Sequence, residues 1–258
     1  MNHDFRKRLH QRDTLLGTIV SSTDPAIAEV LTECGFDWLF VDGEHGPFET
    51  TDLLPVLRAV DHRIPCAVRV PAPEEIAIKK TLDIGAAGII APQTNTVEEV
   101  EAVVRYCRYS PQGSRGVGLS RATTYGLGLT QYVGSANDSV AVIVQAEHID
   151  AVENIEKIVK VEGVDAVFIG PYDLSASMGK MGEVNAPDVI EAIDHVTNAC
   201  NAVNMPLGIF GVSADAVKPY VDRGYSLIVS GVDVLMMANA AKGMLSTLRS
   251  NGDPKDTQ

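Results

Sequence analysis

Cysteines and aromatic residues are scarce in this sequence. The four cysteines, at positions 34, 66, 107 and 200, form no close pair and no CxxC motif. We therefore expect reduced cysteines, and neither a disulfide framework nor a structural zinc site. Aromatic residues make up only 5% of the chain, while hydrophobic residues make up 45%. This composition indicates a mainly aliphatic core, as in a parallel sheet covered by helices.

Positive charge is scarce as well. Lysine and arginine number 21 against 34 aspartates and glutamates, which gives a formal net charge of -13. Such a charge disfavours nucleic acid and anionic membrane surfaces as partners. No apolar run approaches the length of a membrane span, and the first residues lack the apolar stretch of a signal peptide. We therefore expect a soluble cytoplasmic protein.

Short, continuous apolar segments alternate with longer amphipathic segments along the chain. The predicted strands are 14–20, 38–42, 66–70, 88–91, 140–146, 164–169, 205–210 and 226–230. The predicted helices are 24–35, 49–61, 73–84, 96–107, 150–161, 187–203, 213–223 and 232–249. Their strict alternation predicts an α/β protein with one (β/α)8 TIM barrel over residues 1–250 and a polar tail over 251–258.

A doubly wound open sheet is the alternative fold. The Gly-x-Gly-x-x-Gly motif is absent after the first predicted strand, which weakens a dinucleotide-binding version of that fold. One connection, at about residues 108–138, is unusually long. Loops of this length are usually functional lids or partner contacts, and its residues Arg121 and Tyr125 could help to select a substrate.

Two carboxylates stand at the ends of neighbouring predicted strands. Glu147 closes the run 141–147, and Asp173 follows the run 167–172. Such residues lie together at one rim of a barrel, where they could hold one hard divalent metal such as Mg²⁺, Mn²⁺ or Co²⁺ and leave positions for substrate. The alternative is that Asp173 only caps the turn over 173–177 and that Glu147 only caps the next helix.

Two further strand ends carry charged side chains. His45 follows the strand that ends at Asp42, which could fix the tautomer of a histidine base; the alternative is a loop histidine bonded to backbone. Glu44 could be a cap or a supporting partner. Arg69 lies in an apolar run, so its guanidinium must be paired. It could hold a substrate carboxylate or enolate oxygen, form a structural salt bridge, or do both.

Lysine is absent from every predicted strand. Schiff-base aldolases need a lysine inside the barrel, and Lys180 is the only lysine expected near the mouth. Enolate chemistry assisted by a metal therefore fits this sequence better than imine chemistry.

Several long segments resemble the HpcH/HpaI family of class II pyruvate aldolases. They are residues 36–45 (FDWLFVDGEH), 108–116 (RYSPQGSRG) and 161–171 (VEGVDAVFIGP), followed by Asp173-Leu174-Ser175 and Met178-Gly179. The resemblance runs in order from the first predicted strand to the last predicted helix. It implies a TIM barrel whose last helix packs onto a neighbouring subunit, in a hexamer built as a trimer of dimers.

The resemblance also implies a role for each site residue. The implied metal ligands are Glu147 and Asp173. The implied catalytic residues are His45 as base, Asp42 as its dyad partner and Arg69 as the group that stabilises the enolate. The implied substrate-binding residues are Arg69, Gln145 and the backbone of Tyr172 and Asp173. Two positions depart from the family pattern. Tyr172 stands where a small residue is usual, and His148 where a small hydroxyl residue is common, which leaves the aldehyde partner open.

The implied reaction is the reversible retro-aldol cleavage of a 4-hydroxy-2-keto acid to pyruvate and an aldehyde. His45 removes the proton of the C4 hydroxyl, and the metal and Arg69 stabilise the pyruvate enolate. Oxaloacetate decarboxylation, which passes through the same enolate, is a close alternative. A CoA-ester lyase of the citrate-lyase type ranks lower because no basic patch for the CoA phosphates is evident, and a non-catalytic binder of small acids ranks lowest.

Overall fold

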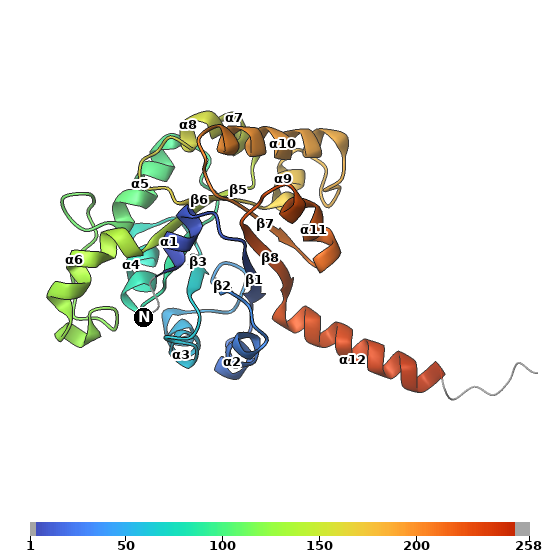
Figure 1. The fold of residues 1–258 in the computed structure, drawn as a ribbon, viewed down its shortest axis with the longest axis horizontal. Coiled ribbons are helices and arrows are strands. Elements are labelled where there is room, and N and C mark those ends of the chain that lie inside the picture. The colour runs from blue at the N-terminus through green and yellow to red at the C-terminus, as the bar shows by residue number, and fades with distance from the viewer. Residues whose placement is uncertain (1–3, 251–258) are drawn as a thin grey trace, which may run out of the picture.

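Eight parallel strands close into a barrel in the computed structural model, which describes residues 4–250 (Figure 1). The strands are β1 Leu15–Val20, β2 Trp38–Asp42, β3 Cys66–Arg69, β4 Gly88–Ala91, β5 Ala141–Ala146, β6 Ala166–Ile169, β7 Leu207–Gly211 and β8 Leu227–Val232. Each strand pairs with the next along the chain, and β8 pairs with β1. The predicted TIM barrel is therefore confirmed, and the open sheet is excluded. The predicted tail, 251–258, lies outside the described residues.

Helices surround the barrel on its outer face (Figure 1). They are α2 Pro25–Glu33, α3 Thr50–Ala59, α4 Glu75–Asp83, α5 Val97–Cys107, α7 Ile149–Glu153, α8 Ile155–Ile158, α10 Pro187–Ala202 and α11 Ala214–Asp222, and one further predicted helix, α12 Asp233–Ser250, follows β8. The single helix predicted over 150–161 is instead two short helices, α7 and α8, because the chain leaves helical geometry at Asn154. The Asn154 side chain donates hydrogen bonds to the carbonyls of Asn95 and Asp150.

Four further elements were not predicted. They are α1 Phe5–His10, the 3-10 turn η1 Thr124–Gly126, α6 Leu129–Ser139 and α9 Pro171–Ser177. The long connection over 108–138 is thus partly helical. Its residue Arg121 donates to the carbonyl of Ile84 and pairs with Asp61, and the hydroxyl of Tyr125 accepts from Arg58. These contacts hold the connection against the outer helices.

Both faces of most strands are buried, which explains their continuous apolar runs. The strand register places polar residues beside one another at the ends of the strands. Asp42, the last residue of β2, pairs in register with Arg69, the last residue of β3. Ala146 of β5 pairs with Ile169 of β6, so Glu147 and the segment that begins α9 leave the sheet at the same level.

An aromatic column fills the interior of the barrel. At the N-terminal end of the strands, Phe5 and Leu9 of α1 are buried against the interior residues. The ring centroids of Phe5 and Trp38 lie 5.5 Å apart, those of Trp38 and Phe40 6.1 Å, and those of Phe40 and Phe168 5.6 Å. This column fills the barrel from its N-terminal end and packs beneath the residues at the C-terminal ends of the strands.

The last helix, α12, projects away from the barrel (Figure 1). It exposes the large apolar side chains Val234, Leu235, Met237, Met244, Leu245 and Leu248. None of the described helices has the length and hydropathy that a bilayer crossing requires.

Candidate active site

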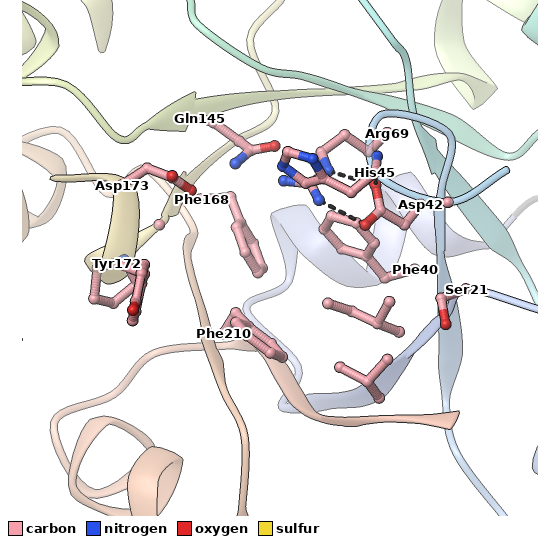
Figure 2. Close-up of a pocket in the computed structure, with 15 residues that line it drawn as sticks. Ser21, Phe40, Asp42, His45, Arg69, Gln145, Phe168, Tyr172, Asp173 and Phe210 are labelled. Carbon is pink, nitrogen blue, oxygen red and sulfur yellow. Dashed lines mark hydrogen bonds and ion pairs between the residues drawn. The ribbon is translucent and has the colours of Figure 1, made fainter. Parts of the chain in front are cut away.

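A cavity of about 360 Å³ opens at the C-terminal ends of the strands, where TIM-barrel active sites lie. Its polar lining residues are Ser21, Asp42, His45, Arg69, Gln145, Tyr172 and Asp173 (Figure 2). Six of the seven residues predicted for the site therefore meet in one cavity. The seventh, Glu147, lies just behind the lining: a Cβ added at Gly170, which lines the cavity, would be 3.2 Å from Oε2 of Glu147.

A tight turn after β2 carries His45 into the cavity. The N–H of Gly43 donates to the carbonyl of Arg69 at 2.9 Å, and the N–H of Gly46 donates to the carbonyl of Asp42 at 3.1 Å. A Cβ at Gly43 would lie only 2.6 Å from that Arg69 carbonyl, so the close approach requires glycine. The carboxylate of Asp42 accepts the backbone N–H groups of Glu44 and His45, which fixes the turn.

Arg69 and Asp42 form a bidentate ion pair. Nε of Arg69 donates to Oδ1 of Asp42 at 2.9 Å and Nη2 donates to Oδ2 at 2.7 Å, while Nη1 lies 3.2 Å from Oε2 of Glu44. Burial would raise the pKa of Asp42, but its hydrogen bonds and charge interaction with Arg69 outweigh burial and hold that pKa below its ordinary value. The guanidinium also lies over the Phe40 ring, 5.3 Å from its centroid.

The hydrogen bonds of Asp42 differ from the predicted dyad. Its carboxylate contacts the backbone N–H of His45 rather than the imidazole ring. The imidazole ring instead lies near Glu44, with Nε2 of His45 3.9 Å from Oε2 of Glu44. Asp42 thus orients Arg69 and the turn, and Glu44 is the acidic neighbour of the imidazole. Arg69 forms the predicted structural salt bridge and also lines the cavity, and its contact with substrate stays a prediction.

Glu147 is a buried carboxylate that forms no ion pair with a lysine, arginine or histidine of the described chain. Oε1 accepts the backbone N–H of Gln93 at 2.8 Å and its side-chain amide at 3.2 Å, and Oε2 accepts the amide of Gln145 at 2.5 Å. Burial raises the pKa of Glu147 to about 7, and the nearby charges of Glu44 and Asp173 raise it further against the lowering effects of Gln93 and Arg69. The positive charge of Arg69 therefore compensates the ionised form only in part.

Gln93 follows the fourth strand, at the rim where the sequence places the site, but no role was predicted for it. Its backbone has φ of 51°, in the left-handed region that residues other than glycine rarely occupy. This conformation turns both its N–H and its side chain onto Glu147. Strained backbone of this kind persists where the surroundings impose it, and it gathers at functional sites.

Asp173 lies in the first turn of α9, which begins at Pro171. Its side chain is exposed and faces the cavity (Figure 2). The backbone N–H groups of a first helical turn have no partner within the helix, so Tyr172 and Asp173 present donors at this position. His148, by contrast, caps α7, where its Nδ1 accepts the N–H of Asp150.

The residues present fit a hard divalent cation. Glu147 and Asp173 are close enough for the charge of Asp173 to raise the pKa of Glu147, and a cation between them would relieve that repulsion. The buried Oε1 of Gln145 finds no hydrogen-bond partner among residues 4–250, and carboxylate and amide oxygens are the ligands such cations prefer. Within residues 4–250, no group of three or more His, Cys, Asp or Glu side chains is arranged to hold a metal.

Sequence comparison identifies the family to which these residues belong. The family model described as HpcH/HpaI aldolase/citrate lyase matches residues 16–240. The chain belongs to this family. The resemblance inferred from its motifs is confirmed, and the chain is an enzyme, a carbon–carbon lyase of the aldolase type.

Similar members of the HpcH/HpaI family cover nearly the whole chain. A hydroxypyruvate/pyruvate aldolase from Cupriavidus necator is 38% identical, over 96% of this chain and 93% of its own length. A 4-hydroxy-2-oxovalerate aldolase from Novosphingobium aromaticivorans is 36% identical, over 93% and 92%. The crystal structure of a family protein from Burkholderia cenocepacia superposes with a TM-score of 0.93 at 35% identity and covers 96% of this chain and all of that one.

Proposed function

We propose that this HpcH/HpaI family member is a divalent-metal-dependent aldolase that reversibly cleaves 4-hydroxy-2-keto acids to pyruvate and an aldehyde. One observation carries the proposal: a buried carboxylate, Glu147, which Arg69 compensates only in part, lies with Asp173 at the rim of a cavity that is also lined by Arg69 and His45. The names of the relatives, which include pyruvate and 4-hydroxy-2-oxovalerate aldolases, support the same reaction class.

The residues that would hold the metal are Glu147 and Asp173. Mg²⁺, Mn²⁺ or Co²⁺ all suit carboxylate ligands, and the bound ion would polarise the 2-keto group as a Lewis acid. Gln93 and Gln145 orient the Glu147 carboxylate through three hydrogen bonds. Hydrogen bonds that orient a metal ligand in this way typically increase metal affinity.

Arg69 would stabilise the negative charge that develops on the keto oxygen. A guanidinium carries five N–H donors, and the contacts with Asp42 and Glu44 engage only three of them. The remaining donors are available to an enolate oxygen in the cavity. Because Asp42 holds one edge of the guanidinium by two hydrogen bonds, little reorganisation accompanies the reaction. The N–H groups of Tyr172 and Asp173 would receive the pyruvate carboxylate.

His45 would be the base of the cleavage. Its imidazole lines the cavity and would take the proton of the C4 hydroxyl. The oxygen then forms the aldehyde carbonyl, the C3–C4 bond breaks, and its electron pair enters the pyruvate enolate. Protonation at C3 completes the release of pyruvate, and synthesis follows the same steps in reverse.

The cavity offers little to a CoA ester. Among the lining residues in the described part of the chain, Arg69 is the one lysine or arginine, and it is already paired with two carboxylates. Lys180 pairs with Asp188 instead of lining the cavity. Oxaloacetate decarboxylation, however, would use the same metal ligands and Arg69, so it is kept as a second candidate activity.

Assembly through α12 belongs to the same proposal. The exposed apolar side chains of this projecting helix have no cover within the described chain, and exposed patches of this kind mark interaction sites. We propose that α12 packs on a second copy, in a hexamer built as a trimer of dimers, and that the enzyme acts in the cytoplasm.

Pyruvate release from 4-hydroxy-2-keto acids and from oxaloacetate, with metal supplied, tests the proposed function. We expect equimolar pyruvate and aldehyde from the hydroxy acids. His45→Ala is expected to slow this cleavage by about 100-fold or more, the usual contribution of a general base, while metal affinity stays the same. Decarboxylation of oxaloacetate removes no hydroxyl proton, so it should be less affected. Absence of pyruvate from every substrate would contradict the proposal.

A further inference from the structure

Glu44 is a half-buried carboxylate at the site that has no role in the reaction described so far. It lies in the turn after β2, directly before His45, and its side chain is 19% exposed. Oε2 of Glu44 lies 3.2 Å from Nη1 of Arg69 and 3.9 Å from Nε2 of His45. One carboxylate oxygen therefore faces both the proposed base and the cation proposed to stabilise the enolate.

The other acid of this turn, Asp42, is already occupied. Its Oδ1 accepts Nε of Arg69 and the backbone N–H groups of Glu44 and His45, and its Oδ2 accepts Nη2 of Arg69. The Asp42 side chain is also more deeply buried, with 7% of it exposed. Asp42 thus holds the backbone of the turn, and Glu44 is the acid of the turn whose carboxylate faces the imidazole.

A carboxylate beside Nε2 favours the tautomer of His45 that carries its proton on this nitrogen. The lone pair then lies on Nδ1, which would take the proton of the C4 hydroxyl. The imidazole gains a positive charge in this step, within reach of the Glu44 carboxylate. The distance of 3.9 Å exceeds that of a hydrogen bond, and contacts of catalytic groups are often long before substrate binds and tighten afterwards.

We propose that Glu44 is a positioning residue that acts through His45, orienting the neutral imidazole and stabilising the imidazolium that forms when the base takes the hydroxyl proton. This inference rests on the proposed aldolase function. The proton stays on the imidazole, and Glu44 forms no bond to substrate. The ion pair with Arg69 holds the Glu44 carboxylate in place before the reaction, so its charge acts without further reorganisation.

Charged groups from several elements surround Glu44. They are Asp42 at the end of β2, Arg69 at the end of β3, Glu147 after β5 and Asp173 in α9. Burial raises the pKa of Glu44 above its ordinary value, and the charges of Arg69 and His45 oppose that shift. All these neighbours are retained when Glu44 alone is replaced, so a difference between the parent and such a variant reports the charge of Glu44.

Glu44→Gln, which keeps the shape of the side chain and removes its charge, tests the proposal with the 4-hydroxy-2-keto acid that the parent cleaves fastest. We expect kcat to fall on the order of tenfold, because the base loses part of its contribution. KM should change little, since Glu44 is not among the described residues that line the cavity. The acid limb of kcat/KM should move to lower pH by on the order of half a pH unit, because an imidazolium without its negative neighbour loses its proton more readily.

Three further variants serve as controls. Glu44→Asp keeps the carboxylate and should keep the acid limb at the position of the parent, whereas Glu44→Ala should move it as Glu44→Gln does. Glu74→Gln removes the same charge from an exposed residue after β3 whose side chain caps no helix, and it should leave both kcat and the acid limb unchanged. In a His45→Ala background, Glu44→Gln should cause little further loss, because Glu44 acts through the base.

Pyruvate release by the parent enzyme separates this inference from the proposed function. Cleavage by the parent, with a lowered kcat and a shifted acid limb in Glu44→Gln and Glu44→Ala, supports the inference. Parent-like variants, a lowered kcat with an unmoved acid limb, or an undiminished further loss in the His45→Ala background overturns the inference and leaves the aldolase function intact. Absence of pyruvate from every substrate overturns the proposed function, and the inference with it.

Discussion

The two ends of the barrel hold their buried carboxylates in opposite ways. At the N-terminal end, Asp165 precedes β6 and is surrounded by positive groups and donors. It contacts Nε of Arg6 at 2.7 Å, Nε2 of His10 at 2.7 Å and Nη2 of Arg108 at 3.3 Å, and accepts the N–H of Val142 at 2.8 Å. Burial would raise the pKa of Asp165, but these contacts, led by His10 and Arg6, hold it below its ordinary value.

At the C-terminal end, Glu147 is equally buried but is bonded only to amides and a backbone N–H. Burial raises its pKa to about 7, and the neighbouring acids Glu44 and Asp173 add to the effect. A carboxylate that the protein compensates fully stabilises the fold, whereas one that it compensates only in part is a candidate functional group, as in the metal site that we propose. The N-terminal end thus serves stability and the C-terminal end serves function.

Removal of the charge of Glu147 is expected to have the largest effect. Glu147→Gln should lower metal affinity by more than about 100-fold and cleavage by about 1,000-fold or more, since the metal supplies several kcal/mol of charge stabilisation. Titration calorimetry with Mn²⁺ and steady-state kinetics measure the two effects. Asp165→Asn is the matched control, and its folded fraction should bind metal as the parent does. Equal loss of metal affinity in both variants would contradict the proposed difference in role between Glu147 and Asp165.

Removal of the charge of Asp165 should instead destabilise the fold. Asp165→Asn leaves Arg6 and Arg108 without their carboxylate, and breaking such a buried pair costs about 3–5 kcal/mol of unfolding free energy. Urea unfolding at neutral pH measures this cost. Glu147→Gln, compared as metal-free protein, is expected to show no such loss, because the ionised form of Glu147 is disfavoured in the fold. A similar loss in both variants would show that the carboxylates have the same role.

Lowering the pH should remove the contribution of Asp165 to the free energy of unfolding. Its folded pKa is lowered, so its stabilisation is fully present above the unfolded pKa of about 3.9 and is lost as pH falls through the folded value. The stability difference between the parent and Asp165→Asn should therefore be constant above about pH 5 and shrink below about pH 4. Unfolding curves across this range provide the test, and a difference that grows towards acid would have the wrong sign.

Substitution of Gln93 is expected to have a smaller effect on metal affinity. Gln93→Gly removes the side-chain hydrogen bond to Glu147 and keeps the backbone N–H in its left-handed conformation, so metal affinity should fall by about tenfold. Asn204→Gly is a matched control, since Asn204 has φ of 57° at the other end of the barrel. Both changes relieve a strained backbone, yet only the first should alter metal binding.

Local sequence patterns were sufficient to predict the barrel. Continuous apolar runs located β2 and β4 at their observed bounds, because strands buried on both faces leave an unbroken apolar signal. The short helix α9 was not predicted, although Pro171 after Gly170 is a helix-start signal. Helix α6 contains Gly134 and ends in the polar run Asn137-Asp138-Ser139, so the connection over 108–138 gave a weak helix signal.

The residues at the strand ends also predicted most of the site, since the C-terminal ends of the strands meet at one rim of a barrel. The hydrogen bonds among these residues could not be predicted from the sequence. Asp42 binds Arg69 and the backbone of His45 instead of the imidazole, because the turn after β2 directs the ring towards Glu44. Gln93 reaches Glu147 through an unusual backbone conformation. Arg121 and Tyr125 contact the outer helices and do not line the cavity of their own chain.

The most direct test of the account is pyruvate release from a 4-hydroxy-2-keto acid by protein treated with EDTA and then supplied with Mg²⁺, Mn²⁺ or Co²⁺. We expect activity to be lost with the metal and regained when it is restored, and Glu147→Gln to stay inactive at the same metal concentration. Full activity in protein whose metal content is verified as negligible would contradict the central claim, that Glu147 and Asp173 hold the ion on which enolate formation depends.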